Sequence, residues 1–251
     1  MISIALSSDR TVATNAFTVF PREFGFDNFG RIFATSMIYT YILNSIKLSF
    51  FAIVGQLLVS SFVAYGFARL RARGKNIVFM ILLATMMIPS EVTMIPQFLI
   101  FRSLRMLDTL YPLILPNFFG GAFNIFLLRQ SIMRIPYAFD EAAIVEGVGY
   151  PRIWFSLILP AIQPILVAIS IFTFSWNWGW FTGPLIYISS PEKYPLALGA
   201  YFITETSAKG AIPPWNLIMV TALLLTLPMI MVYALGQKYV YAANIGGGGL
   251  K

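Results

Sequence analysis

The stretch that decides the fold reads MIYTYILNSIKLSFFAIVGQLLVSSFVAYGFA over residues 37–68 and continues as RLRARGK over residues 69–75. The first part is apolar over more than the ~20 residues that a helix needs to cross a bilayer. The second part carries four cations in seven residues. Positive charge beside the end of a spanning helix is retained on the cytoplasmic side. This stretch therefore predicts a membrane-spanning helix that leads into a short cytoplasmic loop.

The composition agrees with a membrane protein and excludes several classes. Hydrophobic residues make up 58% of the chain, charged residues 11%, and the mean hydropathy is +0.78, whereas about a quarter of a soluble domain is charged. The chain has no cysteine and no histidine, which excludes disulfides, thiolate or imidazole metal sites and nucleophile–histidine catalysis. The net charge of +7 comes from cations at the ends of apolar segments, so nucleic-acid binding is not expected.

Four further apolar blocks follow, which gives five predicted spans in an all-α membrane protein. They cover residues 77–101, 111–128, 164–188 and 215–235. The block 77–101 is expected to be broken at Pro89 and Pro96. Alternation from the basic loop places residues 129–163 inside, together with the tail 237–251. It places residues 1–36, 102–110 and 189–213 outside. The expected organisation is an outer N-terminal segment 1–36, a transmembrane domain 37–236 and a cytoplasmic tail 237–251.

The two ends of the chain are unusual. Residues 1–6 are apolar but too short to span, and residues 9–36 are polar and aromatic. An outer N-terminus with nothing to carry it across predicts that a first spanning helix is missing. The tail from Gly246 to Lys251 has no apolar pattern and is expected to be flexible.

The inside segment PYAFDEAAIVEGVGYPRIWFSLILP covers residues 136–160. Pro136 can open a helix, and Gly147 with Gly149 can end it in a turn of positive φ. Pro151 can open a second short helix, which Pro160 closes. Local chemistry thus predicts two short helices at a sharp angle, lying under the membrane. The pair Ala142–Ala143 lets another surface approach closely, and an exposed Glu141 offers a charge to a basic partner.

The same segment resembles the EAA loop of binding-protein-dependent ABC importer permeases. The matching positions are Glu141, Ala142, Ala143, Gly147, Leu157, Leu159 and Pro160. The match departs at Leu157, where the family more often has Ile, at Glu146, often Asp, and at Pro151, which replaces a more usual non-proline residue. These changes keep the turn and the apolar face.

Flanking strings resemble one branch of that family, the maltose-type carbohydrate permeases. They are Leu43-Asn44-Ser45, Ala64-Tyr65, Ala68-Arg69-Leu70, Ile88-Pro89, Ile95-Pro96, Phe126-Leu127-Leu128 and Trp176-Asn177. The resemblance implies a six-helix fold in the bacterial cytoplasmic (inner) membrane, surrounded by lipid, with one helix before the outer segment. It implies a second permease of similar fold, a dimer of ATPase subunits and an extracytoplasmic solute-binding protein that touches the outer loop 189–213.

In that family the EAA loop is a coupling helix docked in a groove of the ATPase, which the resemblance implies for residues 141–147. The alternative is an ordinary amphipathic hairpin at the membrane surface. The sequence has no Gly-x-x-x-x-Gly-Lys-Ser/Thr string to cradle phosphate and magnesium. The chain is therefore expected to be no enzyme and to hold no cofactor or metal, while the partner ATPase binds ATP and Mg²⁺.

Polar residues within the spans are candidates for a substrate pathway. Lys47 lies ~13 Å into the first span, at 1.5 Å per residue, and Asn44 is one turn away. An ionisable residue at that depth usually faces protein or water. The pair would contact sugar hydroxyls or an acidic sugar; the alternative is a snorkelling lysine or an interhelical hydrogen bond. Glu91, between two prolines, faces either the pathway or the outer surface.

Aromatic residues near residue 176 form a second candidate pathway site. Phe172, Trp176 and Trp180 recur at i, i+4 and i+8, with Asn177 adjacent. Aromatic faces stack on sugar rings, and an amide reads hydroxyls. The alternative is an interfacial aromatic belt with core packing.

We therefore expect an alternating-access permease that imports a sugar or oligosaccharide with energy from a partner ATPase. A rival of the same class imports glycerol phosphate or another non-sugar solute. An ion-coupled secondary transporter would need paired intramembrane acids or an inverted repeat, and the sequence displays neither. A membrane enzyme is disfavoured by the missing histidine and cysteine.

Overall fold

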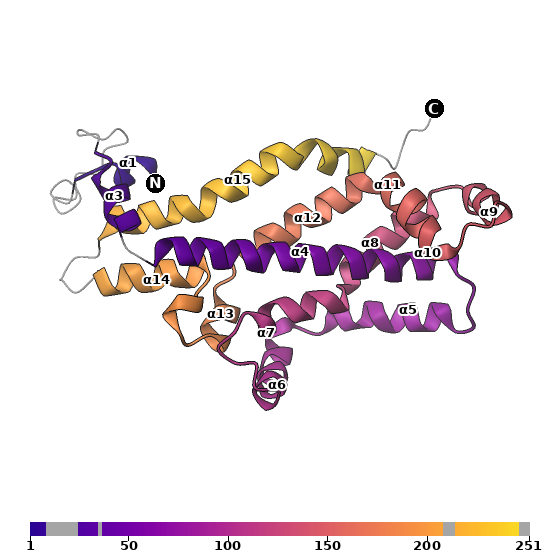
Figure 1. The fold of residues 1–251 in the computed structure, drawn as a ribbon, viewed down its shortest axis with the longest axis horizontal. Coiled ribbons are helices and arrows are strands. Elements are labelled where there is room, and N and C mark those ends of the chain that lie inside the picture. Colours follow the sequence, from indigo (N-terminus) through magenta and orange to yellow (C-terminus); the bar gives the residue numbers. More distant parts are fainter. Residues whose placement is uncertain (9–24, 35–36, 208–213, 246–251) are drawn as a thin grey trace. The chain divides into compact units, whose positions relative to one another are not determined.

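The computed structural model describes residues 1–8, 25–34, 37–207 and 214–245. Every regular element in these ranges is a helix (Figure 1), so the predicted all-α class is confirmed. The chain forms two compact units. The first comprises Met1–Phe50, Leu107–Leu113 and Ser175–Val232, and the second comprises Phe51–Met106, Ile114–Phe174 and Tyr233–Lys251.

The first unit is built from short helices and from parts of three longer ones. Its elements are α1 (Ile2–Ala5), α3 (Asp27–Ala34), the start of α4 (Ile38–Arg69), α7 (Tyr111–Ile114), the end of α12 (Gln163–Trp178), α13 (Thr182–Tyr187), η4 (Pro191–Lys193), α14 (Leu196–Ser207) and most of α15 (Trp215–Ile245). Buried Asn28 ties the N-terminal helices together, because its amide donates to the Ala5 and Ser7 carbonyls at 2.9 Å. The Asn216 amide in turn donates to Asn28 Oδ1 at 2.9 Å.

Helices α4 and α14 pack closely within the first unit. The Ser45 hydroxyl on α4 accepts a bond from the Leu196 N–H at 2.7 Å, at the start of α14. At Gly199 the helices approach so closely that a Cβ atom would lie 2.1 Å from the Tyr41 ring. This approach requires a residue without a side chain.

The second unit contains the remaining helices. They are the rest of α4, α5 (Lys75–Ala84), η1 (Thr85–Met87), α6 (Ser90–Ser103), η2 (Leu115–Phe119), α8 (Ala122–Met133), α9 (Ala138–Val145), α10 (Tyr150–Ile153), the π-helical η3 (Trp154–Ile158), α11 (Leu159–Ala161) and the start of α12. Its core consists of fully or nearly fully buried side chains: Ala64, Tyr65, Phe79, Ile125, Leu128, Ile132, Ile153, Ile158, Ile162 and Ile169. Burial of this apolar set supplies the main packing energy of the unit.

Within the described residues, three helical stretches are long and apolar enough to cross a membrane: Ile38–Arg69, Tyr111–Met133 and Trp215–Val240. Two bent pairs bring the total to as many as five spans if each pair counts as one: Lys75–Met87 with Ser90–Ser103, and Tyr150–Ala161 with Gln163–Trp178. The predicted number of spans agrees with this upper count.

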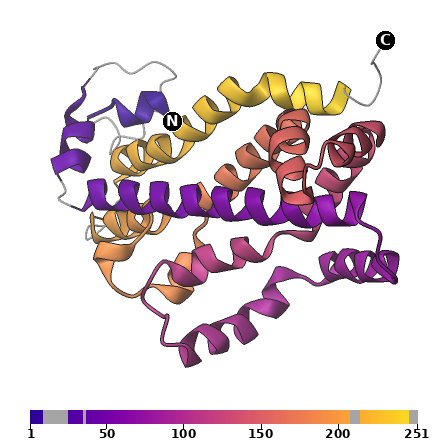
Figure 2. The same ribbon diagram turned by 45° about the vertical axis from the view of Figure 1, so that its right-hand side comes forward.

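The break predicted at Pro89 in the second span, residues 77–101, is confirmed, whereas the break predicted at Pro96 was wrong because Pro96 lies inside helix α6. The two halves of the span meet at 99° (Figure 2). Pro89 is the cause, because the residue before a proline is pushed out of helical geometry, and Ile88 is extended with ψ 116°.

The predicted fourth span over residues 164–188 is also interrupted. Helix α12 ends at Trp178, directly before Gly179, and α13 begins at Thr182. Glycine is a poor helix former. At its other end α12 follows the preceding helix at 81°.

Two further helical segments lie outside the predicted spans. The outer loop 189–213 contains helix α14, and α15 continues past Gln237 to Ile245. The predictions for residues 9–24 and for the glycine-rich end 246–251 lie outside the described residues.

Candidate functional site

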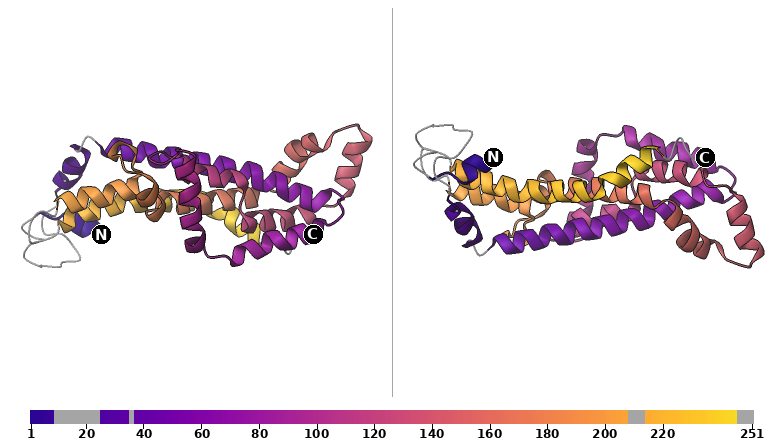
Figure 3. Two further views of the ribbon diagram at one scale, coloured as in Figure 1. Left: turned by 90° about the horizontal axis from the view of Figure 1, so that it is seen from below. Right: turned by 90° about the horizontal axis from the view of Figure 1, so that it is seen from above.

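Residues 136–160 form a helical hairpin, as their prolines and glycines predict (Figure 3). Helix α9 ends in a Schellman motif, in which the Gly147 N–H donates to the Ile144 carbonyl and the Val148 N–H to the Ala143 carbonyl, both at 2.9 Å. Gly147 has φ 79°, the left-handed conformation that favours glycine. Pro151 lies in the first turn of α10. The second helix continues through a π-helical turn to Ala161, so Pro160 lies one residue before its end.

The two faces of α9 differ in their surroundings. Glu141 and Ala142 are exposed, as are the apolar side chains of Phe139 and Val145, the latter at 88%. Ala143 is half-buried against the core of the second unit. The exposed side of α9 therefore combines apolar side chains with a carboxylate.

The second helix of the hairpin is held by the core. Ile153 and Ile158 are fully buried, and Leu157 and Leu159 pack against the same cluster. The Trp154 ring meets the Phe62 ring edge-on with centroids 5.3 Å apart. Leu157 and Leu159, which the resemblance assigned to coupling, pack the hairpin against this core.

A buried ion pair joins α9 to the last residue of α4. Arg69 Nε lies 3.2 Å from Asp140 Oδ2, with side-chain exposures of 6% and 2%. The Arg69 guanidinium also donates to the Ile135 carbonyl at 2.8 Å and lies 5.6 Å from the Tyr137 ring centroid. Burial raises the pKa of the Asp140 carboxyl, and the Arg69 charge opposes that shift. The pair fixes the start of the hairpin on the end of a spanning helix.

A cleft of about 580 Å³ opens beside this ion pair. It is lined by Arg69, Leu70, Arg71, Tyr137, Glu141 and Tyr150. Carboxylate, guanidinium and phenol groups therefore face one space at the base of the hairpin. Such a cleft suits a charged side chain from another protein.

The predicted pathway residues in the first two spans have different surroundings. Asn44 is buried, and its amide donates to the carbonyls of Glu192 at 2.9 Å and Tyr194 at 3.2 Å. Lys47 is exposed. Glu91 lies in the first turn of α6, is also exposed, and accepts a bond from the Ser90 hydroxyl at 3.1 Å. The structure therefore does not bring Asn44 and Lys47 to one surface.

The predicted aromatic row on α12 ends before its last member. Trp176 is 68% exposed, whereas Asn177 is buried. Trp180 lies beyond the end of the helix, and its ring packs against Gly183, where a Cβ atom would be 2.4 Å away. Neighbouring Trp178 donates its indole N–H to the Leu225 carbonyl at 3.0 Å. The helical spacing on which the row depended thus stops at Trp178.

Sequence reasoning missed a polar clamp in the first unit. The Asp108 carboxylate accepts bonds from the Ser189 N–H at 3.0 Å, from the Ser190 N–H and hydroxyl at 2.8 and 2.6 Å, and from the Lys193 ammonium at 2.6 Å. Hydrogen bonds from Lys193 and Ser190 hold the pKa of Asp108 well below its usual range. Together with the Asn44 bonds, this clamp fixes residues 189–194.

Neither Asp108 nor the Arg69–Asp140 pair had a usable signal in the sequence. Each joins segments that are distant along the chain, and no spacing rule connects them. The positive φ of 57° at Asp108 is a conformation that aspartate tolerates better than most residues. That tolerance is the one local feature that sets Asp108 apart.

The described residues thus form a helical membrane protein with bent spans and a hairpin fastened to its core. Residues 56–243 match the family model of the binding-protein-dependent transport system inner membrane component. The chain belongs to this family, so its partners in an ABC importer complex are a periplasmic binding protein and ATPase subunits. It is a multi-pass component of the inner membrane.

Relatives and a solved structure agree with this assignment. The chain is 28% identical to a polygalacturonan/rhamnogalacturonan transport system permease protein of Bacillus subtilis, over 95% of this chain and 86% of that protein. It is 29% identical to the arabinooligosaccharides transport system permease protein of the same organism, over 92% and 80%. A crystal structure of a bacterial ABC transporter involved in the import of the acidic polysaccharide alginate matches with a TM-score of 0.83 and 25% identity, over 94% and 87%.

Proposed function

We propose that this chain is the carbohydrate-translocating permease of its importer, paired with a second permease of similar fold. The support is the activity of its relatives, which transport polygalacturonan or rhamnogalacturonan, arabinooligosaccharides and galactooligosaccharides. These saccharides include both acidic and neutral ones, so the proposal is limited to oligo- or polysaccharide fragments.

The observation that carries the coupling part of the proposal is the exposed face of α9. Glu141 and Ala142 stand on a helix whose other side is fastened by a buried ion pair. A helix held in this way transmits a displacement instead of absorbing it. We assign Glu141 and Ala142 to contact with the ATPase, and Gly147 to the turn. Ala143, Leu157 and Leu159 hold the hairpin on the core, and Pro160 lies at its exit.

In the proposed cycle, the ATPase subunits bind ATP and Mg²⁺ and close together. The hairpins of the two permeases move with them, and the spans turn the pathway from inward to outward. A docked binding protein then releases its carbohydrate into the pathway. This chain contributes no covalent chemistry.

Co-purification with the ATPase tests the coupling surface. Glu141→Lys and Ala142→Arg place charge and bulk on the exposed face, and each should lower ATPase recovery at least about tenfold. Glu205→Lys is the matched control, because Glu205 is also exposed and helical but lies on α14, and it should leave recovery unchanged. Unchanged recovery in both hairpin variants would refute the assignment.

The carbohydrate assignment needs a separate measurement. Calorimetry of the partner binding protein against a panel of neutral and acidic oligosaccharides, with glycerol phosphate included, should give micromolar binding for a saccharide. Transport of that saccharide into proteoliposomes holding the full complex would follow. Binding of glycerol phosphate alone would favour the non-sugar rival.

The predicted pathway residues fall into two groups, which differ in exposure and to which we assign different roles. Trp176, Lys47 and Glu91 are exposed on this chain and can line a pathway that the second permease completes. Asn44, Asn177 and Trp180 are buried or half-buried, and we assign them to positioning the surrounding segments.

A further inference from the structure

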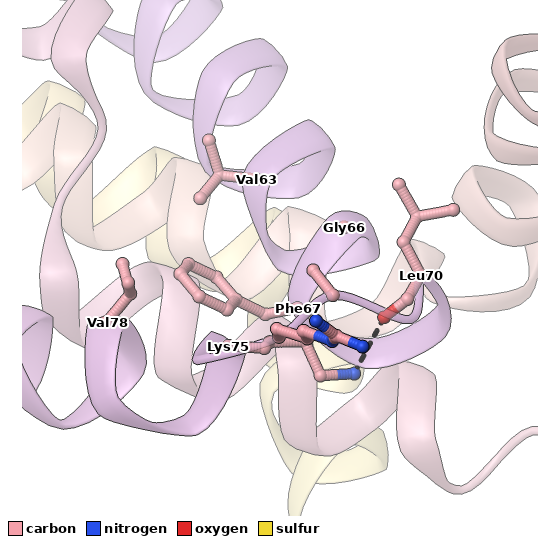
Figure 4. A pocket seen from close by; sticks show the side chains of 8 residues that line it. Val63, Gly66, Phe67, Leu70, Lys75 and Val78 are labelled. Carbon is pink, nitrogen blue, oxygen red and sulfur yellow. Dashed lines mark hydrogen bonds between the residues drawn. The ribbon is translucent and has the colours of Figure 1, made fainter.

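A groove in the second unit combines an apolar wall with cations at one end. It lies between the last turns of α4 and the start of α5, and its volume is about 330 Å³ (Figure 4). The lining residues are Val63, Gly66, Phe67, Leu70, Ala72, Arg73, Lys75 and Val78. It is distinct from the cleft beside Glu141, which shares only Leu70 with it.

The wall of the groove is shaped by one glycine. Val63 and Phe67 extend from α4 and Val78 from α5 toward the same space (Figure 4). Gly66 lies between Val63 and Phe67 on α4, and a Cβ atom built there would meet nothing within 4 Å. The groove is therefore open at Gly66, and a Cβ atom there would enter it without a clash. Val78 is 56% exposed and Ile77 beside it 60%, as expected of side chains that face lipid.

The cations lie where the apolar wall ends. Lys75 donates one ammonium hydrogen to the Leu70 carbonyl at 2.8 Å (Figure 4), which leaves two hydrogens for another acceptor. Arg73 is exposed, as is Arg71 in the same short loop. No acidic side chain lines the groove.

We propose that this groove binds one anionic phospholipid. The headgroup phosphate lies against Arg73 and Lys75, and part of one acyl chain lies along Val63, Phe67 and Val78. A protein segment would be a poorer match, because the loop is at the end of a membrane span and its charge complements an anionic lipid surface. The bound lipid would brace the α4–α5 turn. The proposal depends on membrane residence and not on the coupling role or the substrate.

Lipid-selective fluorescence quenching on the full transporter tests the proposal. The chain has no cysteine, so Ile77→Cys gives it a unique fluorophore beside the groove once cysteines of the other subunits are replaced. The complex is placed in nanodiscs that contain equal amounts of phosphatidylglycerol and phosphatidylcholine, and one of the two carries brominated acyl chains. Each cation near an anionic surface contributes roughly a fivefold preference. Brominated phosphatidylglycerol should therefore quench several-fold more strongly than brominated phosphatidylcholine.

Three variants distinguish a specific lipid site from diffuse attraction, that is, a general electrostatic attraction of anionic lipid to the basic loop. Gly66→Leu fills the groove without changing charge and should abolish the preference, as should Arg73→Gln combined with Lys75→Gln. Arg134→Gln, an exposed cation outside the groove, should retain it. Preserved preference in Gly66→Leu would mean diffuse attraction and would overturn the proposal. Absence of quenching by either lipid would show that another subunit covers the groove and would overturn it too.

Discussion

Arg69 Nε lies 3.2 Å from Asp140 Oδ2, and through this pair the last residue of helix α4 is bound to helix α9. Removing one member of a buried ion pair leaves an uncompensated charge, at a cost of about 3–5 kcal/mol. Asp140→Asn and Arg69→Gln should therefore lower the thermal stability of the complex and reduce transport more than ATPase activity.

A double substitution separates positioning from charge. Arg69→Leu with Asp140→Leu replaces the pair by apolar groups, which is often neutral or stabilising. This variant should recover thermal stability relative to either single variant. Glu141→Gln, exposed on the same helix, should leave stability unchanged. If Asp140→Asn has no effect on either stability or transport, the pair does not position the hairpin.

The sequence could predict the helical hairpin of residues 136–160, but it could not predict the Arg69–Asp140 ion pair that holds the hairpin in place. Pro136, Pro151 and Gly147 act on their own neighbourhoods, so the two short helices and the turn between them could be predicted from local chemistry. Arg69 and Asp140 meet only after α4 and α9 have packed. The break at Pro89 could also be predicted, because a proline restricts the residue before it. Pro96, by contrast, was expected to break the helix and lies inside α6. Helix α14 was missed because it is too short to span and lies among prolines.

The Asp108 clamp predicts local loosening when its charge is removed. Asp108→Asn keeps the side-chain size, but an amide offers one acceptor oxygen where the carboxylate accepts four bonds. Amide hydrogen exchange over residues 187–195 should accelerate at least about fivefold at neutral pH. Asp27→Asn is the control, since Asp27 is exposed in the same unit. Equal exchange in both variants would mean that the clamp does not order this segment.

Acid should release the same clamp in the unmodified protein. Because the folded-state pKa of Asp108 is lowered, its contribution to stability is fully present above the unfolded pKa of about 3.9. That contribution is lost as the pH falls through the still lower folded pKa. The difference between wild type and Asp108→Asn in thermal stability should therefore shrink on acidification below about pH 4. A difference that grows on acidification would contradict this sign.

The contact between Gly199 and Tyr41 predicts a steric effect. A Cβ atom at Gly199 would lie 2.1 Å from a ring carbon of Tyr41, a buried residue. Gly199→Ala should therefore lower stability by roughly 1–3 kcal/mol, the usual cost of overpacking. Gly30→Ala is the matched control, because nothing lies within 4 Å of its added methyl and alanine favours helix α3. A melting temperature of Gly199→Ala equal to that of Gly30→Ala would exclude this close packing.

Two glycines in the hairpin turn allow backbone strain to be separated from side-chain size. Gly147 has φ 79° and Gly149 has φ −73°. A methyl at Gly147 would meet nothing within 4 Å, and one at Gly149 would be 3.9 Å from Pro151, so neither substitution creates a clash. Gly147→Ala should nevertheless cost about 1–2 kcal/mol, because an L-residue is strained in left-handed geometry, while Gly149→Ala should be nearly neutral.

Backbone strain at Gly147 should also affect transport. Strain at Gly147 changes the angle between α9 and the helix that follows it, so Gly147→Ala should lower transport per ATP hydrolysed in proteoliposomes. Gly147→Asn should lie between alanine and wild type, since asparagine tolerates the left-handed region better than alanine. The order glycine, asparagine, alanine in transport per ATP, with Gly149→Ala at the wild-type level, would identify turn geometry as the cause. An equal loss in both alanine variants would assign it to the added methyl group.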